Sequence, residues 1–229
     1  MNVVKSAIDK GEFCPTVLKT EIAETIEQKI EGFRLRYQVY SLERGFEPGQ
    51  NGLETDDHDC HARHVLLRHL PTTTIIGTVR LVTLPVWDLS ATLPMEQVCR
   101  PFRLAQLPRH QVAEVSRFAL SKTLRSVLGE QSKQARLELI RGIVLLSRRI
   151  GIRYWYALME PKLLRLLQHS AIHFQQAGAV VDHHGIRQPS MVDLSEMLLR
   201  VRREQPETWR YLTNDGHFND DEEEQRQAA

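Results

Sequence analysis

Four acidic residues fall within six positions of one short segment. The segment reads Glu54-Thr-Asp56-Asp-His-Asp59 and follows a stretch rich in glycine. Carboxylates this close together repel one another unless cationic groups lie among them. Two interpretations stay open at this point: a solvated acidic surface, or a site that orients a cationic group of a substrate.

A second group of charged residues interrupts the apolar segment Gln111–Leu120, which is predicted to be a strand. It reads Glu114-Val-Ser116-Arg117-Phe118. Strand alternation places Glu114, Ser116 and Phe118 on one face, and Arg117 then lies on the other. A charge on each face of a central strand is costly unless it is paired. The pattern fits either a structural ion pair or a catalytic base with a partner for an anion.

Two arginines lie among apolar neighbours in other predicted elements. Arg36 belongs to the predicted helix Glu21–Leu42, and Arg80 belongs to the predicted strand Ile75–Thr83. A buried guanidinium needs a counter-charge. Either arginine therefore has the acidic segment at 54–59 as a candidate partner.

A metal site is not expected. Four side chains, those of His58, Cys60, His61 and His64, resemble a zinc ligand cluster. However, no second Cys/His pair follows at ligand spacing. The sequence also lacks a Walker loop, a Gly-x-Ser-x-Gly elbow and a dinucleotide fingerprint.

The elements that must position these residues form an α/β (α+β) pattern. Apolar spacing and breaker residues predict a mixed sheet with helices on its faces. The predicted elements are strand Thr16–Lys19, helix Glu21–Leu42, strands His64–Leu70, Ile75–Thr83 and Gln111–Leu120, helix Ser132–Ile150, strand Tyr154–Met159, helix Pro161–His169, short strands near Phe174 and Val180, and helix Leu194–Arg203. Between residues 85 and 110 we expect irregular structure with one short helix near Met95–Val98.

Composition favours one globular domain. The chain has 229 residues, 41% hydrophobic and 26% charged, which predicts a single domain at 1–218 and an acidic, disordered tail at 219–229.

Three widely spaced cysteines predict no disulfide framework. Neither a signal peptide nor a run of about 20 apolar residues is present. We therefore expect a cytoplasmic protein with no integral membrane segment.

Charge is unevenly distributed along the chain. The net charge is only +1, which predicts no nucleic-acid partner, yet residues 100–153 hold twelve Lys or Arg against three Glu, a local balance of +9. Such a segment is either a solvated helix face or a surface for an anionic partner, such as a phosphate or an acidic carrier protein.

Taken together, the motifs resemble those of acyl-homoserine-lactone (autoinducer) synthases, which have a GNAT-like fold. The matching residues are Arg36-x-x-x-Tyr40, Phe46, Glu54-x-Asp56-x-x-Asp59, Gly77-x-x-Arg80-Leu81 and Glu114-x-Ser116-Arg117-Phe118. The later segments Ala157–Leu167 and His184–Pro189 look like acyltransferases of exosortase/PEP-CTERM systems and are similar to N-acyl amino acid synthases, a sister branch. The resemblance implies a mostly antiparallel, twisted GNAT-like sheet flanked by helices on both faces.

The chain departs from the autoinducer synthases at two aromatic positions and in one loop. Phe46 stands where those enzymes usually carry Trp, and Tyr40 where they usually carry Phe. The usual GNAT phosphate loop is absent between Leu120 and Ser132. The missing loop favours an acyl carrier protein over coenzyme A as donor. Phe46 and the resemblance of the later segments favour an amino acid over S-adenosylmethionine as acceptor.

The resemblance implies a role for each candidate residue in amine attack on a thioester. Glu114 would be the general base, while Asp56 and Asp59 would orient the amine. The implied substrate-binding residues are Arg36, Phe46, Glu54, Arg80, Ser116 and Arg117. The implied donor-binding residues are the strand segment Phe118, Ala119 and Leu120 with the basic residues Lys122 and Arg125. No tightly bound cofactor is expected, since the acyl thioester (acyl-ACP or acyl-CoA) is a co-substrate.

The implied function is N-acyl transfer from a thioester carrier to an amino acid or related small amine. Two alternatives stay open. One is an autoinducer synthase that uses S-adenosylmethionine. The other is a GNAT-like module that binds an acyl ligand or a partner without turnover.

Overall fold

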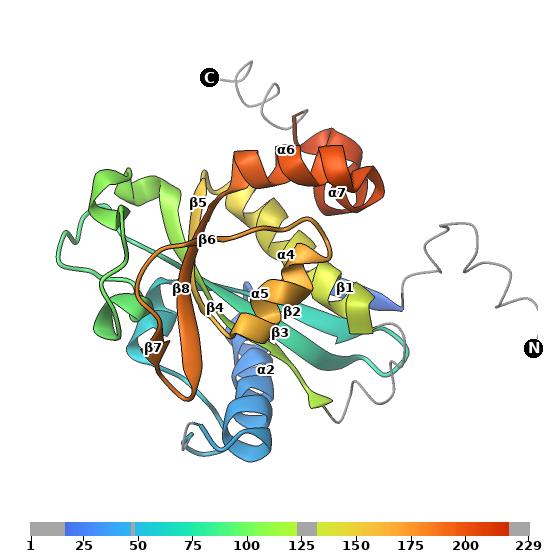
Figure 1. The fold of residues 1–229 in the computed structure, drawn as a ribbon. Helices are drawn as coiled ribbons and strands as arrows, with labels where there is room; N and C mark the ends of the chain where they lie inside the picture. The colour runs from blue at the N-terminus through green and yellow to red at the C-terminus, as the bar shows by residue number, and fades with distance from the viewer. Residues whose placement is uncertain (1–16, 47–48, 123–131, 220–229) are drawn as a thin grey trace, which may run out of the picture.

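The computed structural model describes residues 17–46, 49–122 and 132–219 (Figure 1). Its helices and strands, in chain order, are β1 (Leu18–Ile22), α2 (Ile26–Arg36), the π-helix η1 (Tyr37–Glu43), η2 (Asp57–His61), β2 (Ala62–His69), β3 (Thr74–Thr83), η3 (Pro94–Gln97), η4 (Leu104–Gln106), η5 (Arg109–Gln111), β4 (Val112–Leu120), α4 (Ser132–Arg149), β5 (Tyr154–Met159), α5 (Pro161–Gln168), β6 (Gln175–Gln176), β7 (Val181–Asp182), β8 (Ile186–Asp193), α6 (Leu194–Glu204), α7 (Pro206–Thr213) and η7 (Asn214–Asn219). Arg125 and the predicted tail beyond Asn219 lie outside the described residues.

One large sheet organises the fold. Its strand order is β1-β2-β3-β4-β5-β8-β6, and β7 pairs with β8. Every pair is antiparallel except β4 with β5, which run parallel. The predicted mixed, mostly antiparallel sheet is therefore confirmed. A parallel pair needs a crossover connection, and α4 supplies it between β4 and β5.

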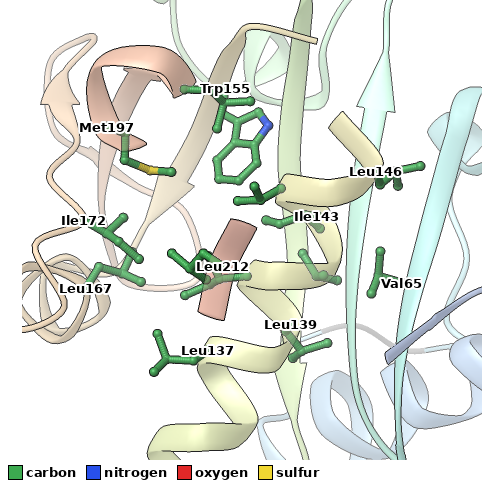
Figure 2. Close-up of a cluster of buried hydrophobic side chains, with 14 of the residues drawn as sticks. Val65, Leu137, Leu139, Ile143, Leu146, Trp155, Leu167, Ile172, Met197 and Leu212 are labelled. Carbon is green, nitrogen blue, oxygen red and sulfur yellow. The ribbon is translucent and has the colours of Figure 1, made fainter. Parts of the chain in front are cut away.

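Helices cover both faces of the sheet (Figure 1). Along β2, Leu66 packs on the α2 face, whereas its neighbours Val65 and Leu67 pack on the α4 face, as strand alternation requires. The α4 face holds the largest apolar cluster. Figure 2 shows Ile143 and Leu146 of α4 in this cluster, together with residues of β5, α5, α6 and α7.

The first helix begins later than predicted. Its N-cap is Thr25, whose Oγ1 accepts the backbone N–H of Gln28 while Gln28 Oε1 accepts that of Thr25, a capping box. The residues Leu18–Ile22 before the cap pair with β2 instead, so the predicted start at Glu21 was wrong. After Arg36 the helix widens into the π-helix η1. Such wider turns occur frequently at functional sites.

Two elements near the C-terminus were not predicted. β8 carries Pro189 in its interior, opposite Leu158 of β5, and a proline argues against a central strand because it lacks a backbone N–H. α7 follows α6 after a single residue, Gln205, and packs against α4 and α6. No helix in the described ranges combines the length and the apolar character that crossing a membrane takes.

Replacing Gly142 by alanine should destabilise the protein by about 1–3 kcal/mol, the usual cost of overpacking a core. Helix propensity alone favours alanine by about 1 kcal/mol. However, a Cβ at this position of α4 would lie 2.5 Å from Cγ1 of Val65, and Val65 is itself fully buried. Urea denaturation measures the change, and a stabilised variant would contradict the close approach of α4 to β2.

Candidate active site

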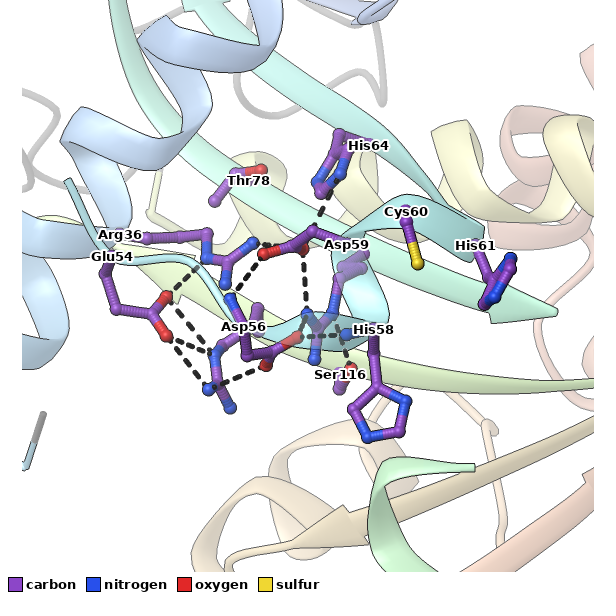
Figure 3. Close-up of polar contacts among 12 residues, drawn as sticks. Arg36, Glu54, Asp56, His58, Asp59, Cys60, His61, His64, Thr78 and Ser116 are labelled. Carbon is purple, nitrogen blue, oxygen red and sulfur yellow. Dashed lines mark hydrogen bonds and ion pairs between the residues drawn. The ribbon is translucent and has the colours of Figure 1, made fainter. Parts of the chain in front are cut away.

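Three arginines and three carboxylates form a closed ring of ion pairs on the α2 face of the sheet (Figure 3). Each arginine lies between two carboxylates, and each carboxylate lies between two arginines. The order around the ring is Glu54, Arg36, Asp59, Arg80, Asp56, Arg117 and back to Glu54. The structure thus brings together the acidic segment and all three candidate arginines. Their formal charges cancel.

The inner half of the ring is buried. Arg36 and Arg80 are fully buried, and Asp59 Oδ1 lies 2.7 Å from Arg36 Nη1 and 2.8 Å from Arg80 Nη1. Arg36 Nε also donates to Glu54. Burial by itself would raise the pKa of Glu54 and Asp59, but the hydrogen bonds and charges of the arginines outweigh it, so both pKa values lie below their ordinary range. Both groups are therefore carboxylates at neutral pH.

The outer half of the ring is partly exposed. Asp56 and Arg117 keep 27% and 22% of their side chains exposed, with 3.1 Å between Asp56 Oδ2 and Arg117 Nη2. Arg80 Nη1 lies 2.6 Å from Asp56 Oδ1, and Arg80 Nε donates to Ser116 Oγ at 3.1 Å. The ring therefore meets β4 at Ser116 and Arg117.

A β-bulge turns Arg117 toward the ring. Ser116 pairs with Arg80 and Ala119 pairs with Thr78, so Arg117 and Phe118 of β4 stand opposite the single residue Val79 of β3. Arg117 has a φ of 51°. The extra residue reverses the faces of the sheet to which the following side chains of β4 point. Phe118 consequently packs toward the α4 face. The predicted faces of Arg117 and Phe118 were therefore wrong, whereas Glu114 and Ser116 do share one face.

The two aspartates also accept backbone hydrogen bonds, Asp59 through its remaining oxygen and Asp56 through the oxygen that already faces Arg80. Asp56 Oδ1 accepts the backbone N–H of His58 at 3.0 Å, and Asp59 Oδ2 accepts that of Asp56 at 2.9 Å. This capping box starts η2 and holds both carboxylates against the arginines. All four oxygens of Asp56 and Asp59 thus have partners within the protein.

Glu114 stands apart from the ring, buried on the same face of β4. Its Oε2 accepts the backbone N–H of Met95, the first residue after Pro94 in η3, at 2.7 Å. Burial raises the pKa of the Glu114 carboxyl to about 7, although this hydrogen bond and the charges of Arg80 and Arg117 oppose the rise. A carboxyl that titrates near neutral pH is well matched to general acid–base catalysis.

The parallel strands β4 and β5 separate beyond Glu114. They pair only at Val112, Ala113 and Glu114, opposite Tyr154, Trp155 and Tyr156. From Val115 of β4 and Ala157 of β5 onward, the two strands border a cavity of about 420 Å³. Its walls include the predicted site residues Phe46, Glu114, Ser116, Arg117, Phe118, Leu120 and Lys122. The split between the strands therefore opens the sheet beside Glu114.

The two sides of the cavity differ in character. On the α4 side its walls are mostly apolar, with Ile140 and Ile143 of α4, Trp155 of β5 and Leu163 of α5. Two cations, Arg136 of α4 and Lys162 of α5, also line the cavity. Trp155 is almost fully buried and its Nε1 donates to Ser147 Oγ at 2.9 Å. On the α2 side the walls carry aromatic and charged side chains from η1, the residues that follow it and the β7–β8 turn.

That polar side contains residues that the sequence interpretation did not assign to the site. Arg44 Nη1 lies 2.5 Å from Glu160 Oε1, and Arg187 Nη2 lies 3.5 Å from the same oxygen. The rings of Phe46 and His184 stack with centroids 5.2 Å apart. The only sequence signal was that Glu160, His184 and Arg187 lie within the segments Ala157–Leu167 and His184–Pro189 of the resemblance.

The ring does not include Ala119, Lys122 or His64. Ala119 is buried against the α2-side cluster, and Lys122 is exposed at the cavity wall, where its backbone N–H donates to Glu43 at 3.0 Å. His64 is buried edge-on against Phe33, and burial lowers its pKa to about 4. Within the described ranges no three His, Cys, Asp or Glu side chains gather as a metal site.

Residues 35–131 match the family model of an acetyltransferase (GNAT) domain. The fold is similar to TofI in a ternary complex with an inhibitor and MTA (TM-score 0.61, 21% identity, 80% of this chain and 96% of that one). It is also similar to BjaI, a CoA-dependent acyl-homoserine lactone synthase, with SAM and isopentyl-CoA (0.59, 18%, 81% and 87%). A third similar structure is FeeM, an N-acyl amino acid synthase from uncultured soil microbes (0.54, 16%, 80% and 94%). No curated protein matches the sequence.

The domain match includes α2 from Leu35 onward, the ring and all of β4, and the similar structures cover most of the chain. The match therefore falls on the segments that build the candidate site. With its open β4–β5 pair and its acetyltransferase-domain match, this chain is an acyltransferase with the GNAT fold.

Proposed function

We propose that the enzyme moves an acyl chain from a carrier-bound thioester to the amine of an amino acid. The observation that carries the proposal is the cavity at the β4–β5 split, which joins an apolar side to a charged side next to Glu114. Acyl transfer between two unlike reactants requires both to meet at one base. A related small amine remains an acceptor of the same class.

The apolar side suits the acyl chain of the donor. In the reaction, Glu114 takes a proton from the attacking ammonium or amine, directly or through one water, and the nitrogen forms a bond to the thioester carbon. The carbon–sulfur bond then breaks and the thiol leaves with a proton. Backbone groups of β4 beyond Glu114, which have no β5 partner, border the cavity and are placed to bind the transient oxyanion.

The charge of the cavity favours an amino acid over S-adenosylmethionine. Among the described residues that line it and lie outside the ring, five are Lys or Arg and two are Glu: Arg44, Lys122, Arg136, Lys162 and Arg187 against Glu114 and Glu160. The ring carboxylates are already paired with arginines. A sulfonium would therefore meet a cationic wall, whereas an anionic acceptor would be attracted.

One observation favours the competing acceptor, S-adenosylmethionine. BjaI has a similar fold and its structure contains SAM together with isopentyl-CoA. The enzyme should therefore be incubated with acyl-ACP or acyl-CoA and each of the twenty amino acids or S-adenosylmethionine, and the products read by mass. An N-acyl amino acid supports the proposal, and an acyl-homoserine lactone overturns it. A module without turnover would release no thiol with any pair.

We further propose an acyl carrier protein as the donor's carrier, docking beside Lys122 and α4. Replacing Lys122 by glutamate should raise KM for acyl-ACP about 5- to 30-fold at low salt, as expected for loss of a charge pair at an interface. The matched control is Lys19→Glu, because Lys19 is exposed on the edge strand β1, which β2 and β3 separate from β4. Equal effects of the two variants would remove Lys122 from the docking surface.

The segments Ala157–Leu167 and His184-Gly-Ile-Arg187-Gln-Pro189 also underlie a narrower proposal, kinship with acyltransferases of exosortase systems. The second segment supplies the β7–β8 turn and the start of β8, and both border the polar side of the cavity. Action in the cytoplasm is a separate proposal, supported by three widely spaced cysteines that imply no disulfide framework.

A further inference from the structure

A cluster of cationic and aromatic side chains closes the polar side of the cavity. It joins three segments that are far apart in the sequence: the residues after η1, the end of β5 and the β7–β8 turn. Its members are Arg44, Phe46, Glu160, His184 and Arg187, all of which line the cavity. None of these residues belongs to the ring, and only Phe46 was a candidate from the sequence. The cluster thus needs its own explanation.

The cluster carries a surplus of positive charge. Two guanidiniums, those of Arg44 and Arg187, share the single carboxylate of Glu160, and Lys162 adds a further positive charge close enough to act on Glu160. The ring nearby balances three arginines with three carboxylates. A cationic excess at the wall of a cavity attracts an anionic group of a ligand.

The guanidinium of Arg187 is held in a fixed position. Its Nη1 donates to the backbone O of Ile186 at 3.1 Å and its Nη2 donates to that of His184 at 2.9 Å. Only 13% of its side chain is exposed. A guanidinium fixed in this way loses little entropy when it binds an anion, and its planar fork matches a carboxylate.

Aromatic faces lie beside the two arginines. Phe46 stacks on His184 with an interplanar angle of 20°, and the guanidinium carbons of Arg44 and Arg187 lie 5.5 Å and 6.0 Å from the centre of the Phe46 ring. The backbone N–H of Phe46 donates to Tyr40 O at 2.8 Å, which ties this group to the π-helix. The cluster therefore presents cations on an apolar, preformed floor.

We propose that Arg44 and Arg187 bind the carboxylate of the acceptor, with Glu160 holding the pair in place until the acceptor arrives. This proposal rests on the proposed function. The bound carboxylate would anchor one end of the acceptor on the α2 side, so that its amine extends toward Glu114 in the same cavity. The site selects amines that carry a carboxylate, whatever the rest of their structure.

The donor also carries an anion, the phosphate of its pantetheine arm, but the geometry favours the acceptor for this site. The cavity walls suited to an acyl chain lie on the α4 side. Phe46 instead contacts Tyr40, which packs on the α2-side cluster, and stacks on His184. The two reactants must approach the reacting carbon from different directions. The effects on the two Michaelis constants distinguish the sources.

The test compares an acceptor with its own decarboxylated form. The acceptor is whichever of the twenty amino acids or S-adenosylmethionine gives the fastest thiol release, and the comparison compound is the amine made by removing its carboxylate. Arg187→Gln and Arg44→Gln should each raise KM for the acceptor about 10- to 100-fold, as expected for loss of a charge-assisted hydrogen bond. KM for the decarboxylated amine and KM for the donor should not change.

The control is Arg165→Gln, because Arg165 is exposed on α5 and does not line the cavity. Arg187→Lys keeps the charge and should recover part of the lost affinity, which separates a binding effect from a folding defect. If the wild type accepts both compounds equally, or if the variants change KM for the donor alone, the carboxylate site is overturned while acyl transfer stands. If no thiol is released with any amine, the proposed function itself fails.

Discussion

Replacing Glu114 by glutamine should lower kcat for acyl transfer by about 10²- to 10⁴-fold, the range that a positioned general base contributes. Glutamine has nearly the same shape and can still accept the N–H of Met95, which lies 2.7 Å from Glu114 Oε2. It cannot take a proton. The loss should therefore appear in kcat, with KM for both substrates nearly unchanged, when thiol release is followed at steady state.

The same base predicts the pH profile. Burial raises the pKa of the Glu114 carboxyl to about 7, and only its deprotonated form can accept a proton. The value of kcat/KM should rise with pH, bend near pH 7 and then level off, and the bend should be missing from the residual activity of the glutamine variant. A wild-type profile that is flat from pH 6 to 8 would remove Glu114 from the role of base.

Stability measurements separate a lost base from a damaged fold. The pKa of Glu114 is higher in the folded protein than its ordinary value of 4.5. The protonated carboxyl is therefore favoured by folding, so its contribution to stability is complete below pH 4.5 and is lost as the pH rises through about 7. At pH 8 the glutamine variant should consequently unfold at the same or a higher urea concentration than the wild type. A clear loss of stability would mean that the drop in kcat reports misfolding.

Local sequence patterns explain why much of the fold and the ring could be predicted. Alternating apolar residues in β2 and β3, and the long apolar stripe of α4, are strong signals because each element buries a whole face. The acidic segment at 54–59 was recognisable as a candidate because carboxylates so close together repel one another unless cations lie among them, with a solvated acidic surface left open as the alternative. Burial of Arg36 and Arg80 was indicated by their apolar neighbours. In each case the signal lies within a few residues of the feature.

Features that depend on contacts between distant segments left no such signal. The bulge at Arg117 is a difference in register between β3 and β4, so the strict alternation assumed for β4 reversed the faces of Arg117 and Phe118. β8 stayed hidden because Pro189 reads as a strand breaker. The cluster combines Arg44 with Glu160 and Arg187, which both lie more than a hundred positions further along the chain.

The second large effect concerns the ring. Replacing Arg36 by methionine should lower the free energy of unfolding by about 3–5 kcal/mol, the usual cost of removing one partner of a buried ion pair. Arg36 is fully buried between Glu54 and Asp59, so its loss leaves two carboxylates facing each other with too few cations. The control is Arg149→Met, which should change stability by less than about 0.5 kcal/mol because Arg149 is 68% exposed and 4.0 Å from Glu24. Urea denaturation at pH 7 measures both.

A double variant tests whether the ring acts as one unit. Glu54→Gln alone leaves Arg36 and Arg117 short of a carboxylate and should also destabilise. Combining it with Arg36→Met removes one charge of each sign, so Arg80 and Arg117 again balance Asp56 and Asp59. The double variant should therefore be more stable than the sum of the two single losses implies, by about 0.5–3 kcal/mol, the range found for coupled neighbours. Strictly additive losses would show that the ion pairs act separately. The ring would then not be one charge-balanced unit. Its charge balance could no longer be used to argue that Asp56 and Asp59 are unavailable to a cationic substrate and that the acceptor is anionic.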